Sequence, residues 1–413
     1  MNAPVSSPRP APGRVRPFAK TQAPTPVWLR LLLGREQAPS RNEYDAVVDA
    51  LWDGDPAMDA FVEWMFAYGP KQSRALFTQA MNEGVGSIAD APQPLREFFR
   101  SVERQPEWLD RELLAEAVPF LHGAGMAAGY VLRDLALMGG YLLSGFNQSL
   151  VMTGALNKGT GQRVAETGKW WVDCTEAGGL ERFGPGFKST LHVRMVHGLV
   201  RRSLAARPDW DSAQWGLPLS QIDMVATYLG FSVVMLGGLR KIGIPVTARE
   251  ARAVIHLWSY ACWLMGVDEK WLVKTEAEGM VLLNHTFMTQ SQADWTSREL
   301  AQALAAEPLQ RHYEHVEGLR RKLAHYQHLS VSHYFLGAER MGKLGLPTDV
   351  GPWFALLSTP PRLVNYSIGR FVPGLRERQQ RRGRAEQLAA LGSMFGDKPQ
   401  GLIEPGKGHP GRL

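Results

Sequence analysis

The stretch that decides the fold is Val193-Arg-Met-Val-His197-Gly-Leu-Val-Arg201, inside a longer segment that runs from Ser189 to Ala205. Apolar residues recur here at steps of three and four, which is the period of one helix face and not of a strand. His197 falls on this apolar stripe, and Arg194 and Arg201 lie at the edges of the same face. We therefore expect a helix with a histidine on its buried side.

The same helical period continues along most of the chain, with Gly or Pro at nearly every joint. Strand-like alternation with Asn-Gly or Asp-Gly turns is absent. The fold class is therefore predicted to be all-α, as a single multi-helix domain over residues 39–395. Residues 1–38, rich in Pro and Arg, are predicted to be a disordered arm, and residues 396–413 a flexible tail. The helices are expected at residues 42–51 (after an N-cap at Ser40), 56–66, 72–81, 94–104, 111–120, 127–143, 162–175, 189–205, 220–240, 248–265, 269–284, 297–306, 310–327, 332–341, 352–357 and 375–391.

The bulk composition is that of a globular protein with a mild positive excess. The net charge is +6, and a basic run extends from Arg376 to Arg384. This run has no interleaved aromatic residues, so we expect no nucleic-acid partner, although the run could contact an anionic membrane surface. Cys174 and Cys262 are the only cysteines and are expected to be buried free thiols. No convincing export signal is present, which predicts a cytoplasmic protein.

A second motif, Arg163-Val-Ala-Glu-Thr167, lies about thirty residues before His197. Arg163 and Thr167 are four residues apart, so they share a helix face, and Glu166 lies three residues from Arg163. A structural role for both motifs is an open alternative. Under it, Arg163 and Glu166 form an ion pair on an amphipathic helix, and His197 is a core histidine bonded to a carbonyl group. The functional interpretation is a neutral imidazole in an apolar wall, which suits a b-type haem.

The two motifs, in this order and at this spacing, resemble the latex clearing protein (rubber oxygenase) family and the wider MpaB-type oxygenases. Short stretches at residues 229–230, 242–245 and 264–267 extend the resemblance, which covers roughly residues 40–360. The resemblance implies a mostly helical fold with a globin-like core and a non-covalently bound haem b. Carried over by position, His197 would be the proximal iron ligand, and Arg163 and Thr167 would lie near the haem. No Cys-x-x-Cys-His motif exists for covalent attachment.

The chain also departs from the rubber-cleaving pattern. Glu166 stands where those members have a distal lysine, and no Asp or Glu occurs between Leu135 and Ala165, where they have a glutamate base. A count along the chain places Asn147 near that position. We therefore expect Glu166 to be able to hold a proton near the iron, whereas activity on polyisoprene stays open. From their positions alone, Arg194 and Arg201 are expected to neutralise the haem propionates.

These expectations define a haem b-dependent oxygenase or oxidase that uses dioxygen or peroxide on an apolar substrate, such as a terpenoid, a lipid or a polymer. The competing class is a non-catalytic helical protein, either a haem or lipid carrier or a membrane-surface module. The histidines at positions 312, 315, 325, 328 and 333 have no carboxylate or thiol partners at matching steps, so they are expected at the surface. The chain has no Walker-type or dinucleotide-binding loop, which disfavours a nucleotide cofactor.

Overall fold

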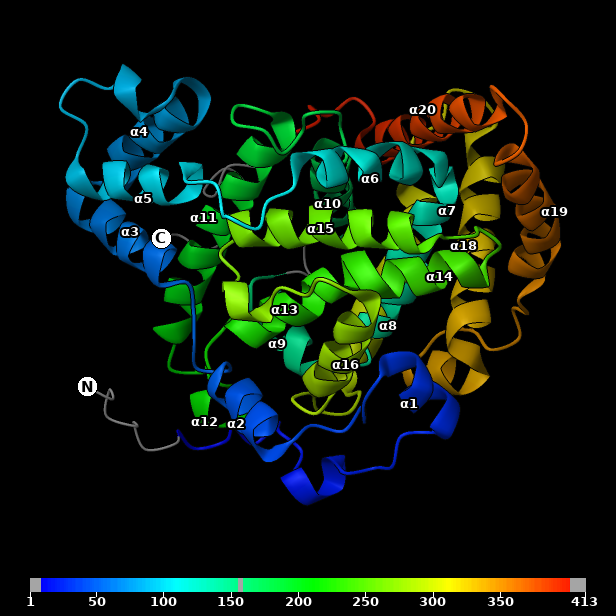
Figure 1. Ribbon diagram of the computed structural model, residues 1–413, viewed down its shortest axis with the longest axis horizontal. Helices are drawn as coiled ribbons and strands as arrows, with labels where there is room; N and C mark the ends of the chain where they lie inside the picture. Colours follow the sequence, from blue (N-terminus) through cyan, green and yellow to red (C-terminus); the bar gives the residue numbers. More distant parts are fainter. Residues whose placement is uncertain (1–8, 155–158, 402–413) are drawn as a thin grey trace.

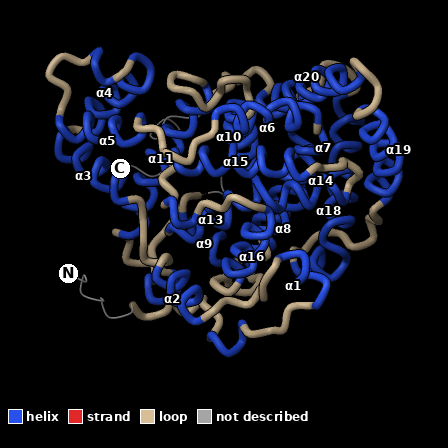
Figure 2. Tube along the Cα trace, viewed as in Figure 1, coloured by secondary structure: helices blue, strands red, loops and turns tan. Residues whose placement is uncertain are grey.

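The computed structural model describes residues 9–154 and 159–401. These residues form helices joined by short loops, and they contain no strand, as Figure 2 shows. The prediction of an all-α fold is confirmed.

The described α-helices are α1 (Val27–Leu33), α2 (Arg41–Asp49), α3 (Pro56–Tyr68), α4 (Pro70–Glu83), α5 (Gln93–Glu103), α6 (Arg111–Gly123), α7 (Gly125–Tyr130), α8 (Met138–Gly140), α9 (Ser144–Met152), α10 (Thr160–Cys174), α11 (Pro185–Ala205), α12 (Ser212–Trp215), α13 (Gln221–Leu229), α14 (Met235–Lys241), α15 (Ala248–Leu264), α16 (Glu276–Phe287), α17 (Trp295–Ala306), α18 (Glu317–Lys343), α19 (Trp353–Gly369) and α20 (Leu375–Phe395). Shorter 3-10 or π segments are η1 (Phe18–Thr21), η2 (Val85–Ser87), η3 (Val131–Leu137), η4 (Gly230–Val234), η5 (Glu269–Trp271) and η6 (Glu307–Gln310).

Helix α15 crosses the middle of the molecule (Figure 1), and α6 and α11 pack against it. Helix α6 lies against both α15 and α20, and α10 lies against both α11 and α20. Helices α3, α4 and α5 project at the upper left of Figure 1, whereas α18 and α19 form its right-hand edge. Helix α11 therefore lies between the projecting lobe, where it contacts α3 and α4, and helices α10 and α15.

The centre of the core is aromatic. Trp258 on α15 is fully buried, and its ring lies 5.4 Å from that of Trp170 on α10 and 5.1 Å from that of Phe231 in η4. Aromatic pairs at these separations add attraction beyond the burial of their area. This cluster fixes α10 against α15 at the level where α10 also meets α11.

Two π-helical segments interrupt otherwise regular helices at neighbouring places. Segment η3 joins α7 to α8, η4 joins α13 to α14, and the two segments pack against each other. A β-carbon at Gly230 would lie 3.7 Å from the β-carbon of Ala136, so the two backbones approach closely. A π segment turns side chains away from the faces of the flanking α-helix, and such segments are frequent at functional sites.

The N-terminal part of the chain differs from the prediction of a disordered arm. Within residues 9–38, Arg14 is buried and donates two hydrogen bonds of 2.9 Å to the carboxylate of Asp223, and the carbonyl of Arg16 accepts from the hydroxyl of Tyr44. Composition does not reveal such specific contacts, and residues 9–38 also contain η1 and α1. Residues 1–8, and 402–413 of the predicted tail, lie outside the described residues.

The helix start predicted after Ser40 is confirmed, whereas the helix expected at residues 269–284 begins only at Glu276, after the N-cap Thr275. Ser40 caps α2, as expected, and Glu43 completes a reciprocal pair with it. Helix α19 was predicted to end at Leu357, but it continues through Pro360 and Pro361 to Gly369. By length and apolar composition, Gln221–Lys241 could cross a membrane, but 61% of its apolar window is buried inside the fold, as is usual for a core helix.

Candidate functional site

Helices α10 and α11, which carry both sequence motifs, are fixed to each other by close contacts. The indole N–H of Trp170 donates to the hydroxyl of Thr190 over 2.9 Å, and the buried thiol of Cys174 lies 3.5 Å from the same oxygen. A β-carbon at Gly186 would come within 2.7 Å of the Cα of Cys174, so only glycine allows this approach. Cys174 and Cys262 are both buried free thiols, as predicted.

His197 lies on α11 with a ring that is only half-buried, so part of it faces accessible space. Its Nδ1 atom is buried and has no hydrogen-bond partner. The pKa of His197 is lowered to about 4, mainly by burial and in addition by the cations of Arg201 and Arg163, while Asp55 opposes this fall. The imidazole is therefore neutral near pH 7, with a free nitrogen lone pair that could bind a metal.

Arg163 on α10 is close enough to His197 to affect its pKa, so the structure brings the two motifs together. Burial lowers the pKa of Arg163, while the buried phenol of Tyr141 and the carboxylate of Glu166 raise it. Within the described residues, the guanidinium of Arg163 makes no ion pair with a carboxylate at contact distance. A half-buried cation without a paired carboxylate is suited to an anionic group of a ligand.

The other residues of the first motif lie toward the outside of α10. Glu166 is half-buried and accepts a hydrogen bond of 3.0 Å from the side chain of Gln162, one turn earlier. Thr167 is exposed. Asn147, at the position of the missing base, is fully buried. Its side-chain amide donates a hydrogen bond of 2.9 Å to the carbonyl of Tyr141, while its Oδ1 atom has no hydrogen-bond partner.

Arg194 and Arg201, expected to neutralise propionates, pair instead with carboxylates of the protein. Arg194 is buried and donates hydrogen bonds of 2.6 and 2.8 Å to the two carboxylate oxygens of Asp55. Arg201 donates a hydrogen bond of 2.6 Å to the carboxylate of Asp59 and one of 3.0 Å to the carbonyl of Leu219. These contacts tie α11 to the start of α3. They correct the expectation that the two side chains are free for a ligand, because position on a helix does not reveal a partner 139 or 142 residues away.

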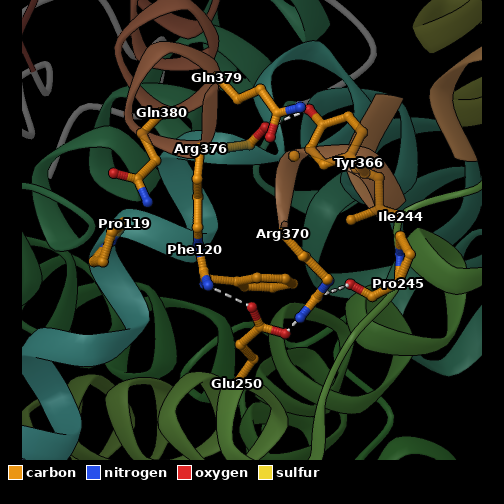
Figure 3. A pocket seen from close by; sticks show the side chains of 12 residues that line it. Pro119, Phe120, Ile244, Pro245, Glu250, Tyr366, Arg370, Arg376, Gln379 and Gln380 are labelled. Carbon is orange, nitrogen blue, oxygen red and sulfur yellow. Dashed lines mark hydrogen bonds and ion pairs between the residues drawn. The ribbon is translucent and has the colours of Figure 1, made fainter. Parts of the chain in front are cut away.

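Two cavities of this structure lie elsewhere. One of about 30 Å³, enough for roughly one water, lies between α6, α15, α19 and α20. In Figure 3, Arg370 and Arg376 point from its wall to the carboxylate of Glu250. The other, of about 210 Å³, is lined by residues of α6 and of the loop after α10, with Tyr260. Neither contains a residue of the two motifs.

A buried charge cluster lies near the N-terminus of α10 and was missed by the sequence analysis. It consists of Arg133 and Asp134 in η3, Glu307 in η6, Arg311 just after η6, and His328 in α18. Arg133 donates a hydrogen bond of 2.6 Å to Asp134 and one of 3.2 Å to Glu307. Arg311 donates hydrogen bonds of 2.8 and 2.9 Å to the carboxylate of Glu307. The Nδ1 atom of His328 lies 2.6 Å from Oδ2 of Asp134. The surface position predicted for His328 is thus wrong, because its partner comes from a residue 194 positions earlier.

The pKa values in this charge cluster are shifted in different directions. Burial raises the pKa of Asp134 to about 7, although Arg133 opposes this. Burial also acts to raise the pKa of Glu307, but Arg133 and Arg311 outweigh it and hold that pKa at about 2. Burial lowers the pKa of His328 well below its usual value, so the imidazole is neutral.

Tyr141 lies between the charge cluster and the motif residues. Burial raises its pKa, and the cations of Arg163 and then Arg133 oppose the rise, so both cations are near it. In addition, a β-carbon at Gly161, at the start of α10, would lie 3.7 Å from Glu307. The charge cluster therefore supports the helix end that positions Arg163. The signal that could have revealed it is the Arg-Asp pair inside a long apolar stretch.

Residues 121–359, more than half of the chain, match the family model described as ER-bound oxygenase mpaB/B'/Rubber oxygenase, catalytic domain. The chain belongs to this family. Both motifs of the MpaB/rubber oxygenase family, with His197 and Arg163, fall inside the matched residues.

Two known proteins illustrate the relation to the MpaB/rubber oxygenase family. The rubber oxygenase of Streptomyces sp. (strain K30) is 25% identical over 189 residues, which are 45% of this chain and 46% of that protein. The match thus spans about half the length of that relative. The solved structure of latex clearing protein LCP in the closed state superposes with a TM-score of 0.66 at 20% identity, covering 86% of this chain and 94% of the other. At that identity the likeness shows the fold alone.

Proposed function

We propose that this chain is a haem b-dependent oxygenase that acts on an apolar substrate. One observation supports it above the others: His197 presents a neutral, half-buried imidazole with an unpartnered Nδ1, beside the unpaired cation of Arg163. Membership of the rubber oxygenase family favours oxygen chemistry at this place. The donor set suits haem, because one neutral histidine is the usual proximal ligand.

In this proposal a bound haem supplies the activation of dioxygen or peroxide. His197 would hold the iron, and Arg163 would attract an anionic group of the cofactor. Because Arg194 and Arg201 are paired with Asp55 and Asp59, their role is to keep α11, and so His197, in position. Thr167 reaches accessible space on the same helix as Arg163 and is proposed to bind the ligand with it.

The nature of the substrate follows from what the site lacks. Asn147 is an amide at the position of the base of the rubber-cleaving members, and it is held by the carbonyl of Tyr141. An amide cannot take up a proton as a carboxylate does. We therefore propose oxidation of an apolar molecule, such as a terpenoid or a lipid, by a route in which Asn147 takes no proton.

Removal of the proposed iron ligand is the direct test. The purified wild-type protein, reconstituted with haem, should show a Soret band, and His197→Ala should lose most of it. His192→Ala is a matched control, because it removes the other histidine of α11 at a different angle around the helix, and it should keep the band. Absence of the band from the reconstituted wild type, or an equal band in His197→Ala, would contradict the proposal.

Glu166 is proposed to hold a proton for the reaction, because it is half-buried on the same helix as Arg163 and close enough to raise the pKa of that residue. One positioned acid-base group is worth roughly 10²–10⁴ in rate. Glu166→Gln should therefore reduce oxygen consumption with an apolar substrate by about that factor, with haem content unchanged. Gln162→Leu, which removes only the hydrogen-bond donor of Glu166, should keep most of the rate. Unchanged turnover in Glu166→Gln would exclude this role.

A further inference from the structure

Helix α19 exposes a continuous apolar face to the outside of the molecule. Six outward apolar residues fall on one side of α19 at helical spacing, and two more follow directly after the helix ends at Gly369. We call this set the α19 apolar face: Trp353, Leu356, Leu357, Leu363, Val364, Ile368, Phe371 and Val372, whose exposed fractions run from 40% to 84%. A surface helix of a globular protein normally presents polar residues to solvent, so a row of exposed apolar residues here is unusual.

The orientation of α19 is fixed by contacts on its inner side. Arg362 donates a hydrogen bond of 2.7 Å to the carbonyl of Ile242. Arg370 donates a hydrogen bond of 2.7 Å to the carbonyl of Pro245 and one of 2.8 Å to the carboxylate of Glu250. Figure 3 shows Arg370 directed inward at Glu250. Because its polar side chains are engaged by the protein, α19 cannot rotate its apolar face inward without breaking these bonds.

The positive charge of the chain is concentrated next to this apolar face. Residues 350–385 contain seven arginines and a single carboxylate, Glu377. Removing them from the 46 basic and 40 acidic residues leaves 39 of each sign, so this segment carries the whole net charge of +6. On α20, Arg378 and Arg381 are exposed and form no ion pair at contact distance within the described residues. Most of the segment also lies beyond residue 359, where the family match ends.

An exposed apolar helix face bordered by unpaired arginines has the chemistry of an interfacial membrane helix. Carboxylates outside the segment pair with four of its arginines, so the exposed excess charge lies at Arg378 and Arg381. A second copy of the chain, docked by the same face, would bring these unpaired cations of two chains together, which is unfavourable. An anionic bilayer is complementary instead, because it takes up the apolar side chains and attracts the arginines. We infer that the α19 apolar face and the adjoining arginines of α20 dock this protein onto anionic lipid bilayers.

Vesicle binding tests this inference without haem or turnover, so its failure and the failure of the proposed function are distinguishable. The full-length protein is floated with vesicles of phosphatidylcholine containing 30% phosphatidylserine, and with phosphatidylcholine vesicles alone. Binding should require phosphatidylserine and weaken as salt rises. Arg378→Gln with Arg381→Gln should weaken binding by roughly 30-fold, since each arginine near an anionic surface contributes about fivefold.

The apolar contribution is tested by Leu357→Glu with Phe371→Glu, at two positions exposed by 71% and 84%, so the fold is not disturbed. This variant should lose binding by at least about tenfold, since two apolar contacts are replaced by charges that anionic lipid repels. Tyr68→Glu, on α3 at the opposite side of Figure 1, changes another exposed apolar residue and should bind like the wild type. The inference is overturned if the wild type does not bind these vesicles, or if the α19 variant binds equally. It is also overturned if the wild type is a dimer that Leu357→Glu with Phe371→Glu makes monomeric, because the α19 apolar face would then be covered by a second copy.

Discussion

Arg194→Met should destabilise the protein by about 3–5 kcal/mol, which is the usual cost of removing one partner from a buried ion pair. Arg194 is 7% exposed and Asp55 is 3% exposed, and two hydrogen bonds of 2.6 and 2.8 Å join them. Methionine fills a similar volume but leaves the carboxylate without its cation. Arg194 also donates a hydrogen bond of 3.1 Å to the carbonyl of Leu264, at the end of α15. A third helix therefore loses a contact in Arg194→Met.

Urea unfolding followed by circular dichroism measures this loss, and Arg202→Met provides the matched control. Arg202 is on the same helix and pairs with Glu63 of the same partner helix, but both side chains are well exposed. Exposed pairs contribute at most about 1 kcal/mol. A loss in Arg194→Met no larger than that in Arg202→Met would show that the buried pair does not hold α11 to α3. If Arg194→Met does not fold, the double variant with Asp55→Asn should recover part of the stability.

The fold was predictable from local pattern, and the errors fall where a distant residue decides the structure. The helix expected at residues 189–205 is present and begins four residues earlier, because Pro185 is favoured at a helix start. The end of α19 was wrong because paired prolines usually stop a helix, whereas here α18 and α20 pack on it and hold it. The helices expected at 310–327 and 332–341 merge into α18 from Glu317, with a non-helical Gly337 near its end.

The candidate site was predictable in its residue types but not in its pairing. Spacing placed His197 on an apolar stripe and Arg163 on another helix, and the structure brings the two within electrostatic reach. Spacing could not show that Asp55 and Asp59 would take up the flanking arginines. Long-range pairing of this kind depends on how the helices pack, and no short motif encodes it.

The charge cluster around Arg133 is a second place where one substitution should have a large effect. Arg133 donates hydrogen bonds to both Asp134 and Glu307, and it also donates one of 2.6 Å to the carbonyl of Leu304. Arg133→Met would leave Asp134 without its cation, while Glu307 would keep Arg311. We expect a loss of about 3–5 kcal/mol in unfolding free energy, as for other buried pairs that lose one partner.

The pH dependence of this loss identifies its cause. Burial raises the pKa of Asp134 to about 7 from an ordinary value of 3.8, so its contribution to stability is full below pH 3.8 and is lost as pH rises through 7. Without Arg133 the pKa rises further, and ionisation of the buried carboxyl becomes more costly. The difference between wild type and Arg133→Met should therefore grow from pH 6 to pH 8, and adding Asp134→Asn should abolish that growth. A difference that stays constant over this range would mean that the lost packing and hydrogen bonds of Arg133, and not the charge of Asp134, cause the destabilisation.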